Sequence, residues 1–200
     1  MILRSAPPSP FGRKIKIAAA LLGFSDDITV ITTDTVDPAD PIRGENPLGK
    51  IPALVLDDGM VIYDSRVILD YLDLKAGGGR LIPQNAMERI KAQTLHALAD
   101  GIMDAAILQI YEIRWRESAK QEQKLLDHQA SKVSRALDYL EASPPSLEGQ
   151  IHVGTIAVAC ALGYLDLRFK GEWRQSYPKL VSWLDAFAAK VPAFEATRAM

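Results

Sequence analysis

Residues 46–54 have the sequence Asn46-Pro47-Leu48-Gly49-Lys50-Ile51-Pro52-Ala53-Leu54, in which a loop runs into a short apolar strand. A bond between a residue and a following proline adopts the cis form far more readily than other peptide bonds. A cis bond at Ile51-Pro52 would expose backbone groups to a ligand. Ten residues after Leu54, Asp64 and Ser65 supply a carboxylate, a hydroxyl and free amides at the start of a helix. The two segments together favour a site for a small peptide-like thiol.

Around this segment, strand and helix patterns alternate through the first third of the chain. Short β-branched or apolar runs predict strands, and Ser9-Pro10 and Asp64-Ser65 are typical helix starts. The connection 34–46 carries three helix-breaking residues and reads as irregular or weakly helical. The predicted strands are 1–4, 28–33, 53–56 and 60–63, and the predicted helices are 10–22 and 65–74. The order is βαβαββα, with two layers around one sheet.

The run Ala76-Gly77-Gly78-Gly79 is the clearest break in the chain. Beyond it the apolar residues recur with helical spacing, and the predicted helices are 85–116, 117–142, 155–169 and 178–190. We therefore predict an α+β protein with two domains, residues 1–76 and an all-helical part over residues 84–200.

Composition excludes several classes of function. The chain of 200 residues has 48% apolar and 24% charged residues and a net charge of -2. This charge balance gives no reason to expect a nucleic-acid or anionic-membrane partner. No stretch approaches the roughly 18 uninterrupted apolar residues that a membrane span needs. We expect a cytoplasmic protein.

Cysteine and histidine usage argues against metal and disulfide chemistry. The single cysteine, Cys160, lies in an apolar run and reads as a buried small hydrophobe. The histidines are far apart and lack ligand spacing: His96, His128 and His152. We expect no metal.

Ser9 stands where a strand passes into a helix, and two interpretations of it remain open. It can be a plain N-cap. Its hydroxyl can also donate a hydrogen bond to a thiolate, which helix amides and the helix dipole would stabilise further. The same ambiguity holds for Pro52, which can be an ordinary trans proline, and for Asp64 and Ser65, which can serve only to start a helix.

These motifs, in this order, resemble the cytosolic glutathione S-transferases, and the resemblance covers essentially the whole chain. Ser9-Pro10-Phe11 with Arg13-Lys14 is similar to the start of the family's first helix, and 46–52 to its Asn-Pro-x-Gly-Lys-Val-Pro segment. Residues 64–68 resemble its Glu/Gln-Ser-x-x-Ile segment, and 157–166 its core helix. The resemblance implies a thioredoxin-like N-terminal domain followed by an all-α C-terminal domain.

The resemblance also implies a role for each motif residue toward glutathione, the co-substrate of the family. Ser9 would hydrogen-bond the sulfur, and Pro52 would be the cis proline that leaves the Ile51 backbone to pair with the cysteinyl unit. Lys50 would lie near the tripeptide. The γ-glutamyl ammonium and carboxylate would be held by Asp64 and Ser65.

The implied activity is attack of the glutathione thiolate on a small electrophile, as in detoxification, by a homodimer. We expect the electrophile between the domains, against Pro7, Pro8, Phe11, Met103, Ile107 and Tyr111. Two alternatives remain: a binding or regulatory protein with little catalysis, and a glutathione-dependent isomerase or dehalogenase.

The chain departs from the family pattern at several places, and two of them bear on ligand binding and stability. Asp64 stands where Glu or Gln is commoner, so its reach to the ammonium is shorter. His152-Val153-Gly154-Thr155 replaces the family's Ser/Thr-x-x-Asp capping box, so we expect the reciprocal cap to be absent at a cost of about 1 kcal/mol.

Overall fold

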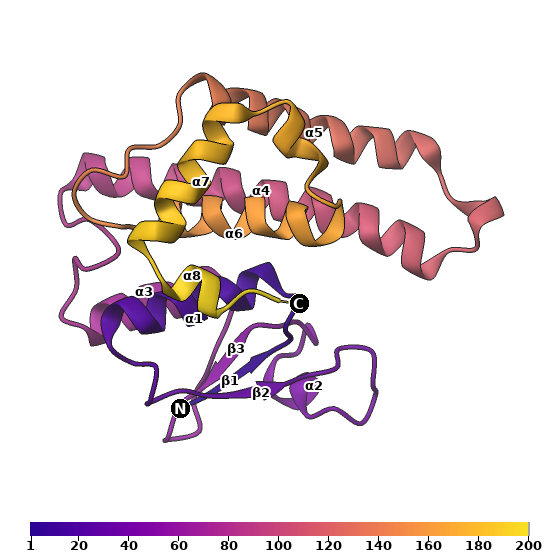
Figure 1. Ribbon diagram of the computed structural model, residues 1–200. Coiled ribbons are helices and arrows are strands. Elements are labelled where there is room, and N and C mark those ends of the chain that lie inside the picture. The colour runs from indigo at the N-terminus through magenta and orange to yellow at the C-terminus, as the bar shows by residue number, and fades with distance from the viewer. Residues whose placement is uncertain (200) are drawn as a thin grey trace.

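The computed structural model describes residues 1–199 and contains one four-stranded sheet (Figure 1). Its strands lie in the order β2-β1-β3-β4. β1 pairs in parallel with β2 and antiparallel with β3, which pairs antiparallel with β4. The bounds are β1 (Ile2–Ser5), β2 (Thr29–Thr32), β3 (Ala53–Val55) and β4 (Val61–Ile62).

Helix α1 (Pro10–Leu22) connects the two parallel strands. It begins at Ser9, whose Oγ accepts a hydrogen bond from the Gly12 N–H at 3.2 Å, and ends at Gly23 in the left-handed conformation with φ of 82°. The connection after β2 contains the short helix α2 (Ile42–Glu45), and α3 (Ser65–Lys75) follows β4. The order βαβαββα is confirmed.

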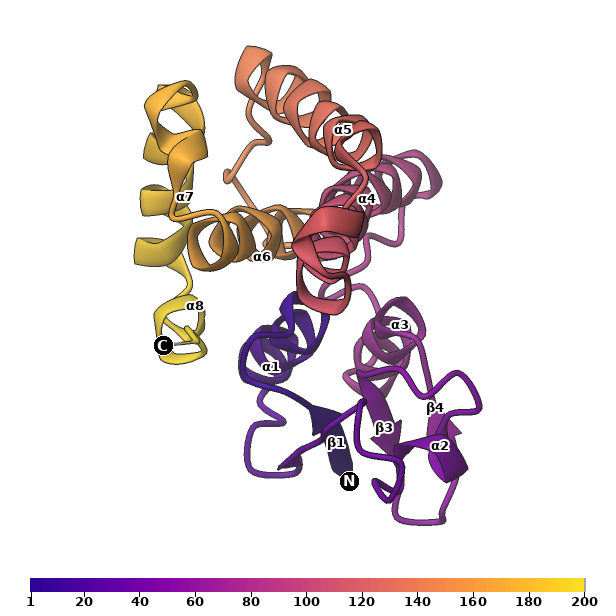
Figure 2. The same cartoon turned by 90° about the vertical axis from the view of Figure 1, so that its right-hand side faces the viewer.

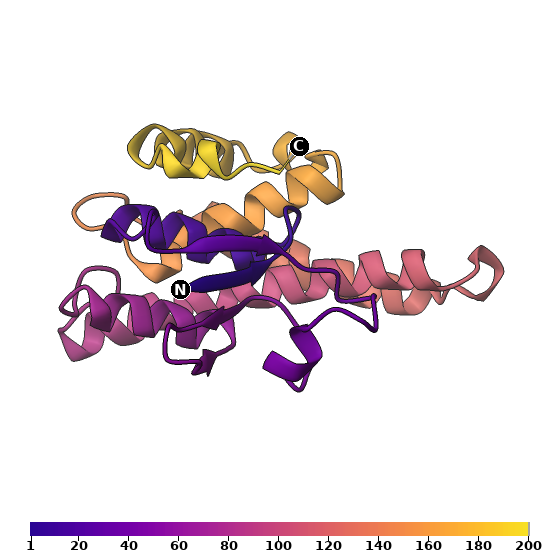
Figure 3. The same cartoon turned by 90° about the horizontal axis from the view of Figure 1, so that it is seen from below.

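All the remaining described elements are helical. They are α4 (Ala86–Trp115), η1 (Ser118–Lys120), α5 (Gln123–Ala142), α6 (Val153–Arg168), η2 (Glu172–Gln175), α7 (Pro178–Lys190) and α8 (Ala193–Ala196). Figure 2 shows α1 and α3 between the sheet and the helices α4 and α6. Figure 3 shows the far end of the α4–α5 pair extending past the sheet. The fold is a thioredoxin-like N-terminal domain followed by a helical C-terminal domain; the bounds 1–76 and 84–200 stay a prediction.

The centre of the helical part is α6, which is apolar on nearly all sides and buried along most of its length. Cys160 lies inside this helix with no exposed surface. Burial raises the pKa of its thiol to about 11, so the group stays protonated. Cys160 is therefore the buried small hydrophobe that the sequence predicts.

The start of α6 corrects one prediction. The Nδ1 atom of His152 accepts a hydrogen bond from the Gly154 N–H at 3.1 Å, and the Thr155 hydroxyl accepts one from the His152 N–H at 3.2 Å. A reciprocal cap is thus present, and the expected loss of about 1 kcal/mol was wrong. A neutral imidazole nitrogen is an acceptor like a carboxylate, and burial favours that form because it lowers the pKa of His152.

Two helix predictions were also inexact. The region 117–142 is not one continuous helix, since η1 precedes a helix that begins only at Gln123, where Glu122 is the N-cap. The terminal helix α8 was missed. Within residues 1–199, no helix is long and apolar enough to cross a bilayer. The same part of the chain contains no group of three His, Cys, Asp or Glu side chains suited to a metal ion.

Candidate functional site

The strand register brings three loops to one end of the sheet. Arg4 of β1 faces Ala53 of β3, so the loop after β1 lies beside the loop before β3. Leu54 faces Ile62 of β4, so the loop after β4 lies at the same end. These loops carry Ser9, Pro52 and Asp64 with Ser65. The segments singled out in the sequence therefore converge.

Ser9 is half-buried at the first turn of α1. Its oxygen accepts the Gly12 N–H, which makes it an N-cap. An acceptor bond does not use the hydroxyl hydrogen, so the same side chain can still donate to an anion in front of the helix. The two interpretations of Ser9 are compatible in this geometry.

The loop before β3 is held by one buried amide. Asn46 Nδ2 donates to the Lys50 carbonyl at 2.8 Å, and its Oδ1 accepts the Leu48 N–H at 3.0 Å. The Ile51–Pro52 bond is cis. Ile51 takes part in none of the backbone hydrogen bonds described for residues 1–199. The neighbouring Lys50 is exposed. The backbone at Ile51 is available to a ligand with the polarity of a peptide.

Asp64 and Ser65 form the start of α3. Asp64 is exposed, and its Oδ1 accepts the Arg66 N–H at 2.9 Å. One carboxylate oxygen is thus committed to the helix, which leaves Oδ2 as the atom that can meet a cation. Ser65 is buried, with 3% of its surface exposed, at the first position of the helix.

A buried ionic cluster, which the sequence analysis missed, ties these helices to α4. Asp100 Oδ1 accepts a hydrogen bond from Lys14 Nζ at 2.5 Å, and its Oδ2 accepts one from Arg66 Nε at 2.7 Å. Lys14 Nζ also lies 2.8 Å from His96 Nε2. Lys14 is fully buried on α1, and His96 and Asp100 are each 2% exposed on α4. One carboxylate therefore fixes both helices that begin at the candidate site.

Charge and burial oppose each other in this cluster. Burial lowers the pKa of Lys14, although Asp100 opposes the shift. Burial alone would raise the pKa of Asp100, but the charge of Lys14 and the hydrogen bonds from Lys14 and Arg66 outweigh it and hold that pKa below its usual range. Burial, followed by the charge of Lys14, lowers the pKa of His96 to about 4. His96 is therefore neutral near pH 7, and its Nε2 can accept from the ammonium.

His96 gives the first prediction. Its pKa is about 4 in the folded chain against 6.5 as the ordinary value, so the unfolded chain binds more protons between these values. The His96 contribution is fully present above pH 6.5 and declines as the pH falls toward 4. We expect a loss of about 2 kcal/mol in the free energy of unfolding between about pH 7 and about pH 5, measured by urea denaturation.

The His96→Gln variant should lose most of this pH dependence, because glutamine can accept from Lys14 but does not titrate. His128→Gln is the matched control, since His128 is exposed on α5 and should leave the slope unchanged. An unaltered slope in His96→Gln would contradict the assignment.

A small cleft opens beside Ser9, between the β1–α1 loop and α6. Pro8 and Ser9 line one side, Tyr164 and Leu167 of α6 another, and Arg198 of the C-terminal segment a third. This cleft shares Pro7 and Pro8 with the predicted electrophile pocket. Met103 has no exposed surface and packs in the core, so its role toward an electrophile stays a prediction.

The other predicted pocket residues lie in varied surroundings. Phe11 and Ile107 are half-buried and pack against the core. Tyr111 is 43% exposed and stacks on Trp115, with ring centroids 5.5 Å apart. None of these three lines the cleft beside Ser9. Their role toward an electrophile stays a prediction.

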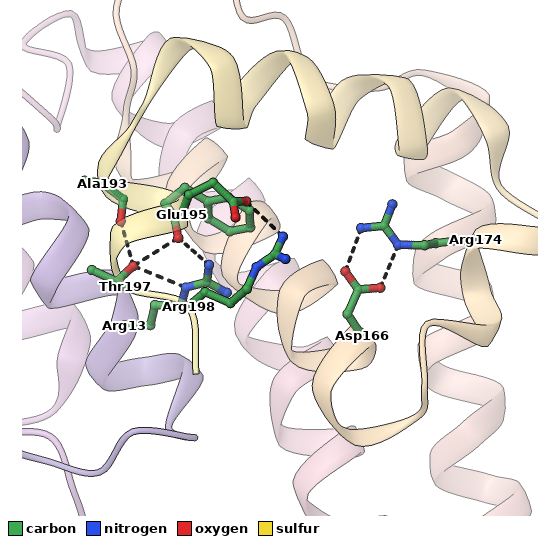
Figure 4. Close-up of polar contacts among 8 residues, drawn as sticks. Arg13, Asp166, Arg174, Ala193, Glu195, Thr197 and Arg198 are labelled. Carbon is green, nitrogen blue, oxygen red and sulfur yellow. Dashed lines mark hydrogen bonds and ion pairs between the residues drawn. The ribbon is translucent and has the colours of Figure 1, made fainter. Parts of the chain in front are cut away.

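The C-terminal segment is fastened to α1 by Arg13 (Figure 4). The buried guanidinium donates to the Phe194 carbonyl at 2.5 Å and to Thr197 Oγ1 at 3.3 Å. It also lies 4.0 Å from the centroid of the Phe194 ring. Burial lowers the pKa of Arg13. Because Arg13 is one turn after Ser9, this anchor brings Arg198 and Ala199 to the cleft.

The comparisons with known proteins agree with this fold. Residues 8–75 match the family described as "Glutathione S-transferase, N-terminal domain", and residues 123–186 match "Glutathione S-transferase, C-terminal domain". The GST-like protein YibF of Escherichia coli K12, described as uncharacterized, is 33% identical over 88% of each chain.

Three solved structures are similar over nearly their whole lengths. A glutathione transferase family member from Pseudomonas fluorescens Pf-5, with bound glutathione, is 43% identical, covers 100% of this chain and 98% of its own, and has a TM-score of 0.92. A structure from the same organism, 42% identical with both chains fully covered and a TM-score of 0.89, holds S-(propanoic acid)-glutathione. A glutathione S-transferase from Methylobacillus flagellatus KT, with glutathione bound, is 35% identical, covers 100% and 99%, and has a TM-score of 0.92. The chain belongs to the glutathione S-transferase family.

Proposed function

We propose that this chain is a glutathione transferase, which activates the glutathione thiol at Ser9 for attack on a small electrophile. The observation that carries the proposal is the meeting of three loops at one sheet end, with the Ser9 hydroxyl hydrogen free to donate. The similar Pseudomonas fluorescens and Methylobacillus flagellatus proteins, which hold glutathione, support the choice of thiol.

The tripeptide would extend from Ser9 toward α3. Its cysteinyl unit would pair with the backbone of Ile51 in the manner of an added strand. Its γ-glutamyl carboxylate would meet Ser65 and the amides at the start of α3, where the helix dipole favours an anion. The ammonium would meet the free Oδ2 of Asp64, and Lys50 would lie near the glycyl end.

The sulfur would then lie in front of α1. A cysteine thiol has a pKa near 8.5, so little thiolate is present at neutral pH. A hydroxyl donor and the positive end of a helix both favour the thiolate, and a shift of about two units would make most of the bound thiol nucleophilic. The cleft beside Ser9 would hold the electrophile within reach of the sulfur.

This proposal predicts a lowered thiol pKa for glutathione bound to the wild-type protein. We expect a value of about 6.5 to 7, measured from the thiolate ultraviolet absorbance during a pH titration. S-methylglutathione, which has no ionisable thiol, is the control. A bound thiol with the pKa of free glutathione would overturn the mechanism.

The second candidate, a binding protein with little catalysis, is favoured by one observation, the use of Asp64 Oδ1 as an N-cap. Calorimetry shows whether the protein binds glutathione. If no heat is released at millimolar glutathione, both the transferase and the glutathione-binding function are rejected. Binding without a shifted thiol pKa would favour the second candidate. We further propose a homodimer and a role in detoxification, as the family membership suggests.

A further inference from the structure

We propose that the electrophile conjugated by this protein carries a carboxylate, and that Arg198 recognises it in the cleft beside Ser9. This inference rests on the proposed function, because it concerns the second substrate of the same site. It assigns a substrate class and a specificity-determining residue.

The side chains that line the cleft carry a net positive charge. Arg13 and Arg198 both line it, and Ser9 brings the positive end of α1 to the same space. No Asp or Glu among the described residues lines it. Arg168, whose guanidinium lies 5.9 Å from the Tyr164 ring, adds a third cation beside one wall. A cleft with this balance attracts an anion.

The two arginines that line the cleft differ in the partners that they hold. Arg13 bonds only a carbonyl and a hydroxyl among the described residues, and the carboxylates of Glu195 and Asp166 act on it through space without a hydrogen bond. The donors of Arg13 hold Phe194 and Thr197. Arg13 therefore positions the C-terminal segment and adds its positive charge to the cleft. Arg198 is the cation with donors to spare.

The ion pair that Arg198 makes with Glu195 is weak enough to be displaced by a substrate. Its Nη2 atom lies 3.0 Å from Glu195 Oε1, with 59% of the Arg198 side chain and 48% of the Glu195 side chain exposed. Pairs this exposed contribute little, because water and salt screen them. Arg198 can therefore share its guanidinium with a substrate, and a planar guanidinium fits a carboxylate well.

The chemistry of addition gives this cation a role in the reaction. When the thiolate attacks the β-carbon of an α,β-unsaturated carboxylate, a carbon–sulfur bond forms and the alkene π pair moves to the α-carbon. The carboxylate thereby becomes a dianionic enediolate, which takes a proton from water to replace the one that the thiol released. Nothing leaves. A cation at the carboxylate stabilises the dianion more than the substrate, which is the condition for catalysis.

The test compares two glutathione thioethers that differ only in charge, S-(2-carboxyethyl)glutathione and its carboxamide. Calorimetry should show the carboxylate binding the wild-type protein about three- to ten-fold more tightly, and added salt should reduce the difference. Arg198→Gln should abolish the preference without changing the affinity for glutathione itself. Glu195→Gln should increase it, since Arg198 loses its competing partner.

Arg89→Gln is the matched control, because Arg89 is also an exposed arginine in an ion pair but does not line the cleft. The Arg89→Gln variant should still bind the carboxylate thioether more tightly than the carboxamide. The kinetic counterpart is addition to acrylate against acrylamide, in which Arg198→Gln should reduce only the acrylate rate. Equal binding of the two thioethers to a protein that binds glutathione normally would overturn this inference alone. Loss of glutathione binding in the wild type would instead reject the proposed function.

Discussion

The Ser9→Ala variant should raise the pKa of the bound glutathione thiol by about one to two units and lower kcat/KM by about a hundredfold. The reason is that the hydroxyl donates to an anion, and a hydrogen bond to a charged group is worth more than a neutral one. The thiol pKa is read from the thiolate absorbance, and kcat/KM from a coloured electrophile at several pH values. The loss should shrink as the pH rises, because free hydroxide then ionises the thiol without help.

Ser9 also caps α1, so alanine removes two functions at once. Loss of the cap alone should lower the free energy of unfolding by about 1 kcal/mol. Ser9→Thr keeps both the acceptor and the donor and should retain most activity. Ser9→Asp keeps the cap but has no hydrogen to donate, so it should fold normally and fail to lower the thiol pKa. A Ser9→Asp variant with wild-type kinetics would show that Ser9 is only a cap.

The parts of this site that the sequence predicts are those set by local geometry. Ser9 with Pro10 starts a helix because an acceptor side chain and a preset φ suffice there. The hairpin of β3 and β4 follows from an Asp-Asp-Gly turn between apolar runs, and it fixes where Asp64 must lie. Once the sheet order is known, register alone brings the loops together.

Contacts between distant segments could not be predicted in this way. Lys14 reads as a surface lysine on an amphipathic helix, yet it is fully buried because Asp100, 86 residues later, pairs with it. The i, i+4 spacing of His96 and Asp100 was the only local signal. Arg13 likewise bonds Phe194 and Thr197, which lie 181 and 184 positions later in the chain. The sequence therefore could not predict that Arg198 forms a wall of the cleft.

The buried cluster gives the second large expected effect. Asp100→Asn should lower the free energy of unfolding by about 3 to 5 kcal/mol, because it leaves the Lys14 ammonium buried without its counter-charge. Glutathione should also bind more weakly, since Arg66, next to Ser65 on α3, loses the oxygen that holds it. Urea denaturation and calorimetry measure the two effects. Asp70→Asn, in the exposed pair with Arg89, is the control and should cost less than about 1 kcal/mol.

A double variant separates the charge from the packing. Lys14→Met with Asp100→Leu removes both charges and fills the space with apolar groups, so it should be more stable than Asp100→Asn alone, although it loses an ion pair. Its glutathione affinity should remain reduced, because Arg66 is still without Asp100. If the losses in the free energy of unfolding of Lys14→Met and Asp100→Leu, each measured alone, add up to the loss of the double variant, Lys14 and Asp100 contribute independently. The cluster would then not be what fixes α1 and α3 against α4.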